Sequence, residues 1–426
     1  MQIHIVQPGE TLFTIGARYS ITPQQIATAN QLPNPDRLVV GQALVIPITG
    51  SYYFVQPGDS LYQIARRNGL TYQELAAING LSPDQPLAVG WRLYLPPAPK
   101  ASAEFNAYAE PFGAVSENLL NRTREAAPYL TYLAPFSFQA KRDGTLSELI
   151  VEPFVPIAEQ NRVTLMMVIT NLEEGAFSDE LGRILLNDQA VQDRLLDSIT
   201  ATAKQYGFRD IHFDFEYLRP ADEEAYTAFL RKAKDRFSKE GWLVSAALAP
   251  KTRADQPGKW YEAHNYKAIG EIVDFVVIMT YEWGYSGGPA QAVSPIGPVR
   301  DVLEYALTEM PASKIMMGQN LYGYDWTLPF VQGSQARAIS PQEAIAIAAR
   351  QGVPIQYDET AQAPFIEYTA EGKDHIIWFE DARSIQAKFD LLKELRLRGM
   401  SYWKLGLSFP QNWLLISDQF NVVKLP

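Results

Sequence analysis

The chain has 426 residues, with 37 Lys and Arg against 48 Asp and Glu, so its formal net charge is −11. An acidic chain without a Lys/Arg-rich block argues against nucleic acid or an anionic membrane surface as the main partner. The length allows about three domains, or one large barrel with appended modules.

The sequence contains no cysteine, which excludes disulfides, thiolate metal sites and cysteine nucleophiles. Its four histidines show no paired ligand spacing, so we expect neither a metal nor another cofactor. The N-terminus lacks the basic start and apolar run of a secretory signal, and no segment reaches the roughly 20 uninterrupted apolar residues of a membrane span. We therefore expect no membrane insertion, and synthesis in a cytoplasm without a signal peptide.

The first hundred residues contain one module twice. Val6–Leu12 (VQPGETL) recurs as Val55–Leu61 (VQPGDSL), and the match continues without a gap to Ile46-Pro47 and Leu95-Pro96. Each copy predicts a strand, a Pro-Gly turn, two short helices and a closing apolar strand. We expect the two modules at residues 1–48 and 51–97.

This βααβ pattern resembles the LysM module over nearly the full length of both copies. The resemblance implies binding of glycans that contain N-acetylglucosamine (GlcNAc), in peptidoglycan or chitin, and tandem copies raise the avidity for such a polymer. By position, the residues of the glycan groove are Gly9, Glu10, Thr11, Leu12, Asn30 and Leu32 in the first copy, and Gly58, Asp59, Ser60, Leu61, Asn79 and Leu81 in the second. For Thr11 and Ser60, a role as helix N-cap explains the residue equally well.

A Pro/Ala-rich stretch at residues 96–102 predicts a short linker. From residue 103 to 426, apolar strand-like runs alternate with amphipathic helical stretches, which predicts an α/β fold, a (β/α)8 TIM barrel. The eight predicted strands are Glu104–Ala109, Leu130–Phe138, Val163–Ile169, Arg209–Glu216, Leu243–Ala249, Asp274–Met279, Lys314–Leu321 and Ser401–Leu405. The clearest predicted helix is Asn187–Tyr206, which is followed at once by Gly207.

The interval between the seventh and the eighth predicted strand is too long for a single helix. Ser340–Gln351 reads as a helix, and Pro354–Tyr357, Phe365–Glu371 and His375–Phe379 read as short strands. We therefore expect a small α+β insertion at about residues 325–380. In a barrel, such an insertion follows the carboxyl end of a strand and builds one wall of the active-site cleft.

The fourth predicted strand, RDIHFDFEY, has the most unusual pattern in the chain. Because side chains alternate along a strand, His212, Asp214 and Glu216 share one face, while Phe213 and Phe215 share the other. The apolar face suits packing against helices, so the carboxyl groups are expected to point into the barrel mouth. An acidic pair there shares one proton, which raises one pKa and provides a general acid near neutral pH. The alternative is a structural ion pair.

This run resembles the D-x-x-D-x-D-x-E signature of glycoside hydrolase family 18, with Asp214 and Glu216 at its last two acids. Arg209 and His212 stand where the signature has Asp, so the outer proton-sharing part of the family mechanism is expected to differ. Two other strand ends are similar to family motifs, namely MTYE at Met279–Glu282 and YW at Tyr402-Trp403.

The resemblance implies substrate-assisted retaining hydrolysis, in which the 2-acetamido oxygen of the substrate attacks C1. Glu216 would protonate the leaving oxygen and then activate water. Asp214 would hold the acetamido group and stabilise the oxazolinium intermediate, and Tyr281 would donate its hydroxyl to the same group. Trp403 would form the apolar floor beneath the distorted sugar, although a core aromatic is the alternative.

Several side chains next to other strand ends are candidates for substrate contacts, although capping or packing explains each of them equally well. They are Asn171, Glu282, Asn320, Tyr322, Tyr324, Asp325 and Trp326. His212 is expected to face the site as a tuning neighbour of Asp214 rather than as a catalyst.

Three functions fit these features. The favoured one is a peptidoglycan N-acetylglucosaminidase that lyses spore cortex fragments during germination, because two LysM copies on this barrel resemble family 18 glycosidases that endospore-forming bacteria deposit on the spore from the mother-cell cytoplasm. A chitinase is built of the same parts, but the departures at Arg209 and His212 disfavour it. A catalytically silent glycan-binding barrel is disfavoured by the presence of Glu216, Asp214 and Tyr281.

Overall fold

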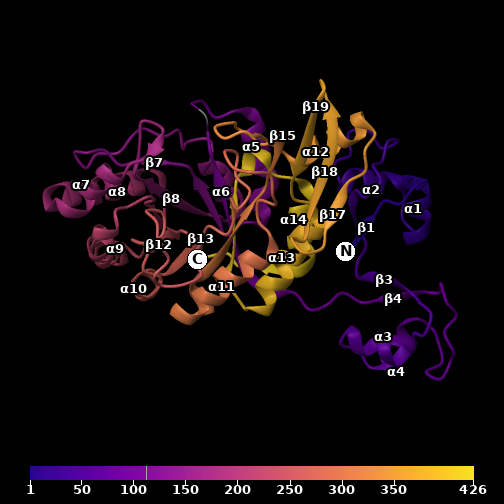
Figure 1. The fold of residues 1–426 in the computed structure, drawn as a ribbon. Helices are drawn as coiled ribbons and strands as arrows, with labels where there is room; N and C mark the ends of the chain where they lie inside the picture. Colours follow the sequence, from indigo (N-terminus) through magenta and orange to yellow (C-terminus); the bar gives the residue numbers. More distant parts are fainter. Residues whose placement is uncertain (112) are drawn as a thin grey trace.

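The computed structural model describes residues 1–111 and 113–426. Figure 1 shows a barrel, and the N-terminal part of the chain forms two small modules outside it. Each module is a two-stranded antiparallel sheet that carries two helices. The elements of module 1 are β1 (Gln2–Ile5), α1 (Leu12–Tyr19), α2 (Pro23–Ala29) and β2 (Ala43–Ile46). Those of module 2 are β3 (Ser51–Phe54), α3 (Leu61–Arg67), α4 (Tyr72–Ile78) and β4 (Arg92–Leu95). The predicted βααβ order of both modules is confirmed.

The barrel is a closed sheet of eight parallel strands, each paired with its neighbours in chain order and the last with the first. Its strands are β5 (Ala101–Ala109), β6 (Tyr132–Pro135), β8 (Thr164–Thr170), β11 (Asp210–Asp214), β12 (Leu243–Leu248), β13 (Phe275–Ile278), β14 (Ile315–Asn320) and β20 (Gly399–Trp403). Short strands beside it are β7 (Phe138–Gln139), β9 (Leu172–Glu173), β10 (Ala176–Phe177) and β21 (Phe420–Val422). The predicted (β/α)8 fold is therefore confirmed.

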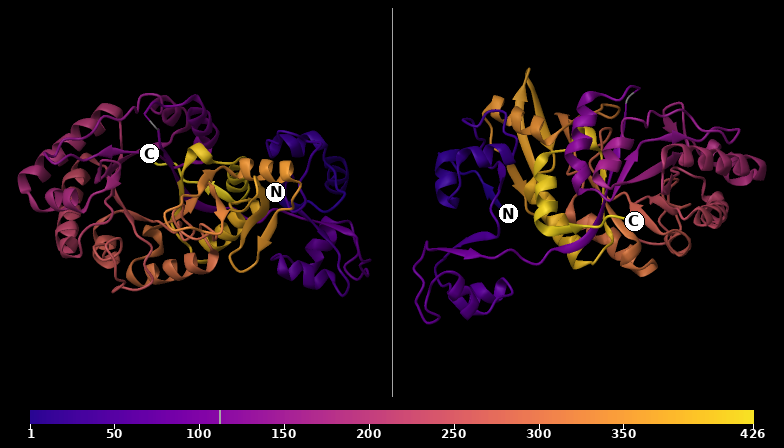
Figure 2. Two further views of the ribbon diagram at one scale, coloured as in Figure 1. Left: turned by 45° about the horizontal axis from the view of Figure 1, so that its top comes forward. Right: turned by 180° about the vertical axis from the view of Figure 1, so that it is seen from behind.

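The helices form a ring outside the strands, which the left view of Figure 2 shows. They are α5 (Glu117–Ala126), α6 (Val155–Asn161), α7 (Asp179–Asn187), α8 (Gln189–Tyr206), α9 (Glu223–Phe237), α10 (Tyr266–Ile272), α11 (Ile296–Glu309), α13 (Ala382–Glu394) and α14 (Pro410–Gln419). In the described part of the chain, 3-10 turns of three residues each begin at Ala127, Pro220, Ser238, Ala312 and Leu405. None of the described helices is long and apolar enough to span a bilayer.

The helix predicted to begin at Asn187 begins instead at Gln189. Asp188 separates it from α7, because its carboxylate accepts hydrogen bonds from the backbone N–H groups of Ala190 (2.9 Å) and Val191 (3.1 Å) and so caps α8. The helix ends at Gly207 as predicted, where φ is +78°.

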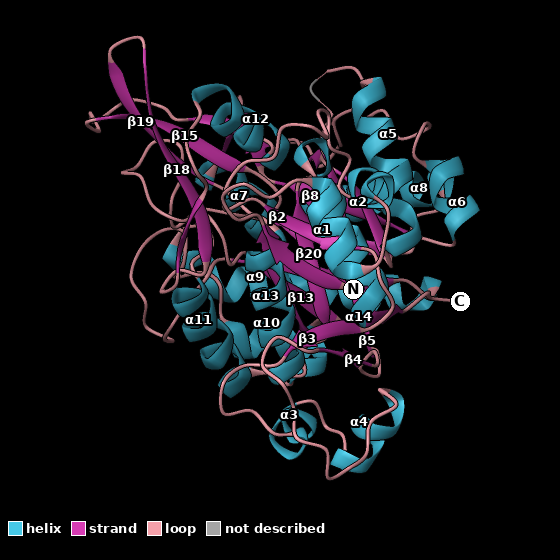
Figure 3. Ribbon diagram, turned by 90° about the vertical axis from the view of Figure 1, so that its right-hand side faces the viewer, coloured by secondary structure: helices cyan, strands magenta, loops and turns pink. Residues whose placement is uncertain are grey.

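Between β14 and β20 the chain forms the predicted insertion. It is a five-stranded antiparallel sheet with one helix, in the order β16-β15-β19-β18-β17, and it projects beside the barrel in Figure 3. Its elements are β15 (Gly323–Leu328), β16 (Arg337–Ile339), α12 (Pro341–Gln351), β17 (Gln356–Asp358), β18 (Ala363–Ala370) and β19 (Lys373–Trp378). β15 was not among the predicted strands, but it pairs with β19 through most of its length.

Module 1 is docked on the barrel and its insertion. Val39 packs in the core of the insertion with Ile355, and the backbone N–H of Ile355 donates to Val40 O at 2.9 Å. Arg383 donates to Gly41 O at 3.1 Å. In contrast, all hydrogen bonds between module 2 and the rest of the described chain run to module 1, and module 2 stands apart from the barrel in Figure 1.

Candidate active site

The acidic strand is oriented as its alternation predicts. Asp214 is the last residue of β11, and Glu216 follows it at the carboxyl end of the barrel, where active sites of this fold lie. Phe213 and Phe215 point the other way and pack on Phe229 of α9, with ring centroids 5.2 and 5.9 Å apart. Packing of the two phenylalanines therefore directs the two carboxyl groups toward the barrel mouth.

A cavity of about 780 Å³ opens at this mouth. Five predicted site residues line it: Asp214, Glu216, Tyr281, Glu282 and Trp403. Aromatic side chains that the sequence analysis did not single out form much of its wall, among them Phe177, Tyr217, Trp260, Tyr261, Trp283 and Tyr285. Flat apolar rings with polar edges suit the faces and hydroxyls of sugars.

Two buried side chains bind the backbone of the segment that carries Glu216. Asn171 binds Glu216 itself, and His264 binds the preceding residue, Phe215. Asn171 accepts a hydrogen bond from Glu216 N (2.9 Å) and donates one to Glu216 O (2.9 Å). His264 Nδ1 accepts from Ala249 N (2.9 Å), so its Nε2–H donates to Phe215 O (2.9 Å). Asn171 was predicted as a substrate contact, but it does not line the cavity and instead positions the Glu216 backbone.

The carboxyl group of Glu216 has a partner from a distant loop. Trp260 Nε1 donates a hydrogen bond of 2.5 Å to Glu216 Oε2. The indole lies parallel to the ring of Tyr217, with centroids 6.1 Å apart and an interplanar angle of 12°. Trp260 lies 44 residues beyond Glu216 in the chain, so no local pattern in the sequence connects the two.

The two carboxyl groups have raised pKa values. Burial raises the pKa of Asp214 to about 7. Burial, and then the charge of Asp214, raise the pKa of Glu216 well above its ordinary value, while the hydrogen bond from Trp260 lowers it. The pair therefore retains a proton near neutral pH, which a general acid requires. Burial also raises the pKa of Tyr281, so its hydroxyl stays protonated as a donor.

A buried hydrogen-bonded chain lies beneath the cavity. His212 Nε2 is 2.9 Å from the hydroxyl of Tyr108, which lines the cavity, and His212 Nδ1 is 2.7 Å from Ser245 Oγ. Ser245 Oγ donates in turn to Asp210 at 2.8 Å. Burial lowers the pKa of His212 to about 3, so the ring is neutral, and burial raises the pKa of Asp210 to about 7. His212 thus contacts Tyr108, and no hydrogen bond joins it to Asp214 among the described residues.

Glu282 is a third carboxyl group in the cavity. It accepts hydrogen bonds from the hydroxyls of Tyr322 and Tyr324, the latter at 3.0 Å, and burial raises its pKa. Trp403, at the end of β20, lines the cavity and contacts Phe136 with ring centroids 4.7 Å apart. Tyr322 and Tyr324 lie behind Glu282, outside the cavity lining.

The remaining candidates near the seventh strand support the insertion sheet. Asn320 donates to Tyr322 O (2.8 Å), and Trp326 donates to Gly288 O (2.9 Å). Asp325 accepts from the Tyr368 hydroxyl at 2.9 Å. None of Asn320, Asp325 and Trp326 lines the described cavity, because β15 carries the last two into the sheet.

The predicted glycan-groove residues of the modules largely build turns and caps. Glu10 accepts from Gln7 N (2.8 Å), and Asp59 accepts from Gln56 N (2.8 Å), so both close the Pro-Gly turn. Gly9 and Gly58 in these turns have φ of +81° and +85°. Thr11 and Ser60 are the N-caps of α1 and α3, Leu12 and Leu61 are buried, and Leu32 and Leu81 are half-buried against the module cores.

Asn30 and Asn79 are bound within their own modules. Asn30 Nδ2 donates to Val45 O (2.8 Å), and its Oδ1 accepts from Val45 N (2.8 Å). Asn79 makes the same pair of bonds to Tyr94, at 3.0 and 2.6 Å. Both amides therefore join the second helix of a module to its closing strand.

The pattern of the glycosyl hydrolases family 18 matches residues 120–407, and that of the LysM domain matches residues 4–47 and 53–96. The chain belongs to glycosyl hydrolase family 18. It is 70% identical over 427 residues to the cortical fragment-lytic enzyme of Bacillus subtilis (strain 168), covering 100% of this chain and 99% of that one. Its fold matches the crystal structure of the Bacillus megaterium QM B1551 spore cortex-lytic enzyme SleL with a TM-score of 0.93 and 56% identity, over 100% and 99% of the two chains.

This family 18 enzyme also shares its fold with a chitinase from Chromobacterium violaceum ATCC 12472, with a TM-score of 0.68, 20% identity, and coverage of 75% of this chain and 99% of that one. The family membership confirms the predicted glycosidase class and the pairing of the barrel with two LysM modules. Sequence reasoning missed Trp260 and His264 as well as the other aromatic residues of the cavity wall, because Trp260 reaches Glu216 and His264 reaches Phe215 O only through the folded chain.

Proposed function

We propose that this family 18 enzyme is a peptidoglycan hydrolase of the bacterial spore cortex, an N-acetylglucosaminidase that cleaves next to GlcNAc during germination. The observation that carries the proposal is the buried Asp214 and Glu216 pair in an aromatic cavity, on a chain 70% identical to a cortical fragment-lytic enzyme. The same similarity supports a location at the spore coat or cortex.

In the first step, protonated Glu216 gives its proton to the glycosidic oxygen while the 2-acetamido oxygen of the substrate attacks C1. The bond from C1 to the leaving oxygen breaks, and a cyclic oxazolinium forms. Asp214 holds the acetamido N–H and stabilises the positive charge with its carboxylate, for which its buried Oδ1 has no other hydrogen-bond partner among the described residues. The hydroxyl of Tyr281 donates to the same acetamido group, and Trp403 packs beneath the sugar ring.

In the second step, the Glu216 carboxylate takes a proton from a water molecule that attacks C1, which opens the oxazolinium and retains the configuration. The Trp260 hydrogen bond favours this carboxylate form, whereas burial and the charge of Asp214 favour the acid form of the first step. One residue thus serves as acid and then as base, as substrate-assisted catalysis requires.

The two LysM modules are proposed to bind the glycan of insoluble cortex. Two weak contacts on one polymer act through effective concentration, so the modules raise the time that the barrel spends beside its substrate. Module 1 would present the polymer in a fixed relation to the barrel because it is docked there, whereas module 2 is held by module 1 alone through hydrogen bonds.

The proposal is tested by mass spectrometry of the soluble products after separate incubation with purified spore cortex fragments, vegetative peptidoglycan and chitin oligomers. We expect fragments from cortex that carry GlcNAc at the new reducing end. Glu216→Gln should abolish their release while pull-down by insoluble peptidoglycan persists. Cleavage of chitin alone would identify a chitinase, and binding of all substrates without cleavage would identify a glycan-binding barrel.

A further inference from the structure

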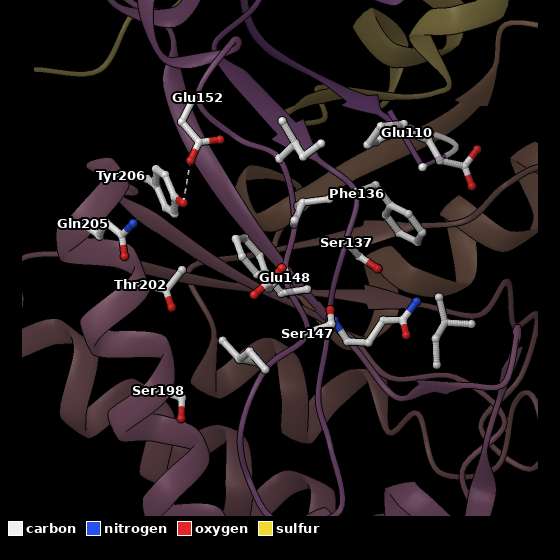
Figure 4. Close-up of a pocket in the computed structure, with 18 of the residues that line it drawn as sticks. Glu110, Phe136, Ser137, Ser147, Glu148, Glu152, Ser198, Thr202, Gln205 and Tyr206 are labelled. Carbon is white, nitrogen blue, oxygen red and sulfur yellow. Dashed lines mark hydrogen bonds between the residues drawn. The ribbon is translucent and has the colours of Figure 1, made fainter. Parts of the chain in front are cut away.

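A second cavity, of about 1050 Å³, branches from the catalytic cavity. The two cavities share Glu110, Phe136 and Leu172 in their linings, so they adjoin each other at these residues. Figure 4 shows the branch with Glu110 and Phe136 at one end, and with Tyr206 and Glu152 at the other. We call this branch the side groove; it runs between the segment at residues 146–152 and the outer face of α8.

The lining of the side groove differs chemically from that of the catalytic cavity. Hydroxyl and amide side chains form much of its wall beside apolar ones. The polar ones are Ser137, Gln139, Ser147, Ser198, Thr202 and Gln205, and the apolar ones include Phe138, Leu146, Leu149 and Ile150. Its carboxyl groups are Glu110, Glu148 and Glu152, and no Lys or Arg is among its described lining residues. Hydrogen-bonding side chains suit sugars and peptides alike, but carboxylates without a cationic partner suit a ligand that carries a positive charge, which the amino group of a peptide supplies and a neutral glycan does not.

The far end of the side groove is its most acidic part. Glu110 is paired with Lys404 at the near end. Glu152 accepts a hydrogen bond from the Tyr206 hydroxyl at 3.0 Å, and hydrogen bonds from its own backbone and from Tyr206 lower its pKa, so it is ionised. Glu148 lies in the same lining, and no ion pair involves either Glu148 or Glu152 among the described residues. This end favours a cationic group.

We propose that the side groove binds the peptide substituent of a peptidoglycan strand, with a free amino group of that peptide at Glu148 and Glu152. The sugar backbone then occupies the aromatic cavity, and the peptide occupies the side groove. The junction of the two cavities corresponds to the point at which the peptide leaves the glycan. This inference rests on the proposed peptidoglycan substrate and names the part of it that the side groove recognises. An unbranched glycan has no group that requires this branch.

The test compares two substrates that differ only in the peptide: cortical glycan strands that carry peptides, and the same strands after an amidase has removed them. Ala201 is an exposed residue of α8 in the lining of the side groove, so Ala201→Trp fills the groove without touching the barrel core. Lys204→Trp is the matched control, because Lys204 is exposed on the same helix and does not line the groove.

We expect the unaltered enzyme to show a kcat/KM at least about fivefold higher on the peptide-bearing strands, which is a differential binding free energy of about 1 kcal/mol. Ala201→Trp should remove this preference and leave kcat/KM on peptide-free strands unchanged, and Lys204→Trp should alter neither. Glu148→Gln, which preserves the shape of the side chain, should raise KM for peptide-bearing strands only. Acetylation of the peptide amino groups should reproduce its effect in the unaltered enzyme.

The inference is overturned if the unaltered enzyme does not distinguish the two substrates. It is also overturned if Ala201→Trp slows both equally, since the groove would then hold glycan. Failure of the proposed function gives a different result, because neither strand would be cleaved by the unaltered enzyme. Circular dichroism melting of each variant separates a folding defect from a loss of recognition, and Glu148→Gln supplies the answer if Ala201→Trp does not fold.

Discussion

Trp260 Nε1 lies 2.5 Å from Glu216 Oε2, so an indole from the loop after β12 donates a hydrogen bond to the acid of the reaction. Burial and the charge of Asp214 raise the pKa of Glu216, and this hydrogen bond lowers it. The bond stabilises the carboxylate form, which acts as base in the second step. The hydrogen bond from Trp260 therefore opposes the effect of burial on the pKa of Glu216. Its contribution can be measured as a change in that pKa.

Trp260→Phe should move the high-pH limb of the kcat/KM profile upward. The variant removes the N–H donor, so the pKa of Glu216 rises and the residue stays protonated to higher pH. A hydrogen bond to a charged group contributes about 1.5–3 kcal/mol, which predicts a shift of about one pH unit or more. The measurement is a pH profile of kcat/KM on soluble cortex fragments.

Tyr217→Leu is the control for this profile, because it removes the ring stacked on Trp260 and leaves the N–H donor in place. It should lower kcat/KM without moving the limb. If the two variants shift the limb equally, the effect comes from packing. An unmoved limb in Trp260→Phe would show that the hydrogen bond does not set the pKa of Glu216.

Asn171→Ala should reduce kcat with little change in KM. The amide of Asn171 binds both the N–H and the C=O of Glu216, so its loss leaves two buried backbone groups without partners and frees the carboxyl group to move. A displacement of about 1 Å costs about 100-fold in rate, and a buried unsatisfied group costs about 1–3 kcal/mol of stability. Steady-state kinetics and urea denaturation measure the two effects.

Asn161→Ala is a matched control, since Asn161 also donates to a backbone oxygen, of Ile157, but in α6 away from the cavity. It should cost stability without altering kcat. Equal kcat for Asn171→Ala and the unaltered enzyme would mean that the backbone of Glu216 is held well enough by the hydrogen bond from His264 to Phe215 O.

Asp210→Asn should reduce the pH dependence of stability. Burial raises the pKa of Asp210 to about 7 in the folded chain, against about 3.9 in an unfolded one. Between these values the folded chain holds a proton that the unfolded chain releases, so the free energy of unfolding falls as the pH rises through this window. The contribution is fully present below about pH 4 and is lost above about pH 7.

Because Asn cannot titrate, the free energy of unfolding of the variant lacks this fall with rising pH. The side-chain oxygen of Asn still accepts the hydrogen bond of Ser245. The groups that act on Asp210 besides burial are Ser245, Asp274, Arg398 and Glu104, all of which the variant retains. Urea denaturation at about pH 5 and about pH 8 should give a smaller stability difference for Asp210→Asn than for the unaltered enzyme. An identical difference would place the titration elsewhere, for example at Asp214.

Structural features that depend on neighbouring residues in the chain could be predicted from the sequence. Features that depend on contacts between distant residues could not. The gapless repeat and the strand and helix periodicities are local patterns, and the fold follows from them. Asp214, Glu216 and Tyr281 lie in short motifs at strand ends, so they could be found and all line the cavity. Trp260 and His264 come from loops whose composition is ordinary, and only the closed barrel brings Trp260 to Glu216 and His264 to the backbone of Phe215.

The incorrect predictions also concern features that depend on contacts between distant residues. Tyr324, Asp325 and Trp326 were predicted as substrate contacts next to a strand end, but they lie in β15, where His375 of β19 and Tyr368 of β18 bind the Asp325 carboxylate. The sequence also did not indicate which LysM copy docks on the barrel, because the contacts depend on residues of the insertion that are distant in the chain. Gly41 and Gly90 occupy the same position of the repeat.

These two glycines give a matched measurement of that docking. Their backbones are alike, with φ of +82° and +85°, and each donates its N–H at 2.8 Å to the first strand region of its own module. A Cβ at Gly41 would lie 1.9 Å from Ile355 O of the insertion, whereas a Cβ at Gly90 would have nothing within 4 Å. Alanine at either position therefore carries the same backbone strain, of about 1–2 kcal/mol, and only Gly41→Ala adds a collision with the barrel domain.

Gly41→Ala should lower the free energy of unfolding by about 1–3 kcal/mol more than Gly90→Ala does, because the steric conflict is relieved only by moving module 1 away from the insertion. The displaced module uncovers Val39 and should increase the radius of gyration in small-angle X-ray scattering, while Gly90→Ala leaves it unchanged. Equal scattering curves and equal stabilities for the two variants would mean that module 1 is not held against Ile355 in solution, and the fixed relation of that module to the barrel would have to be abandoned.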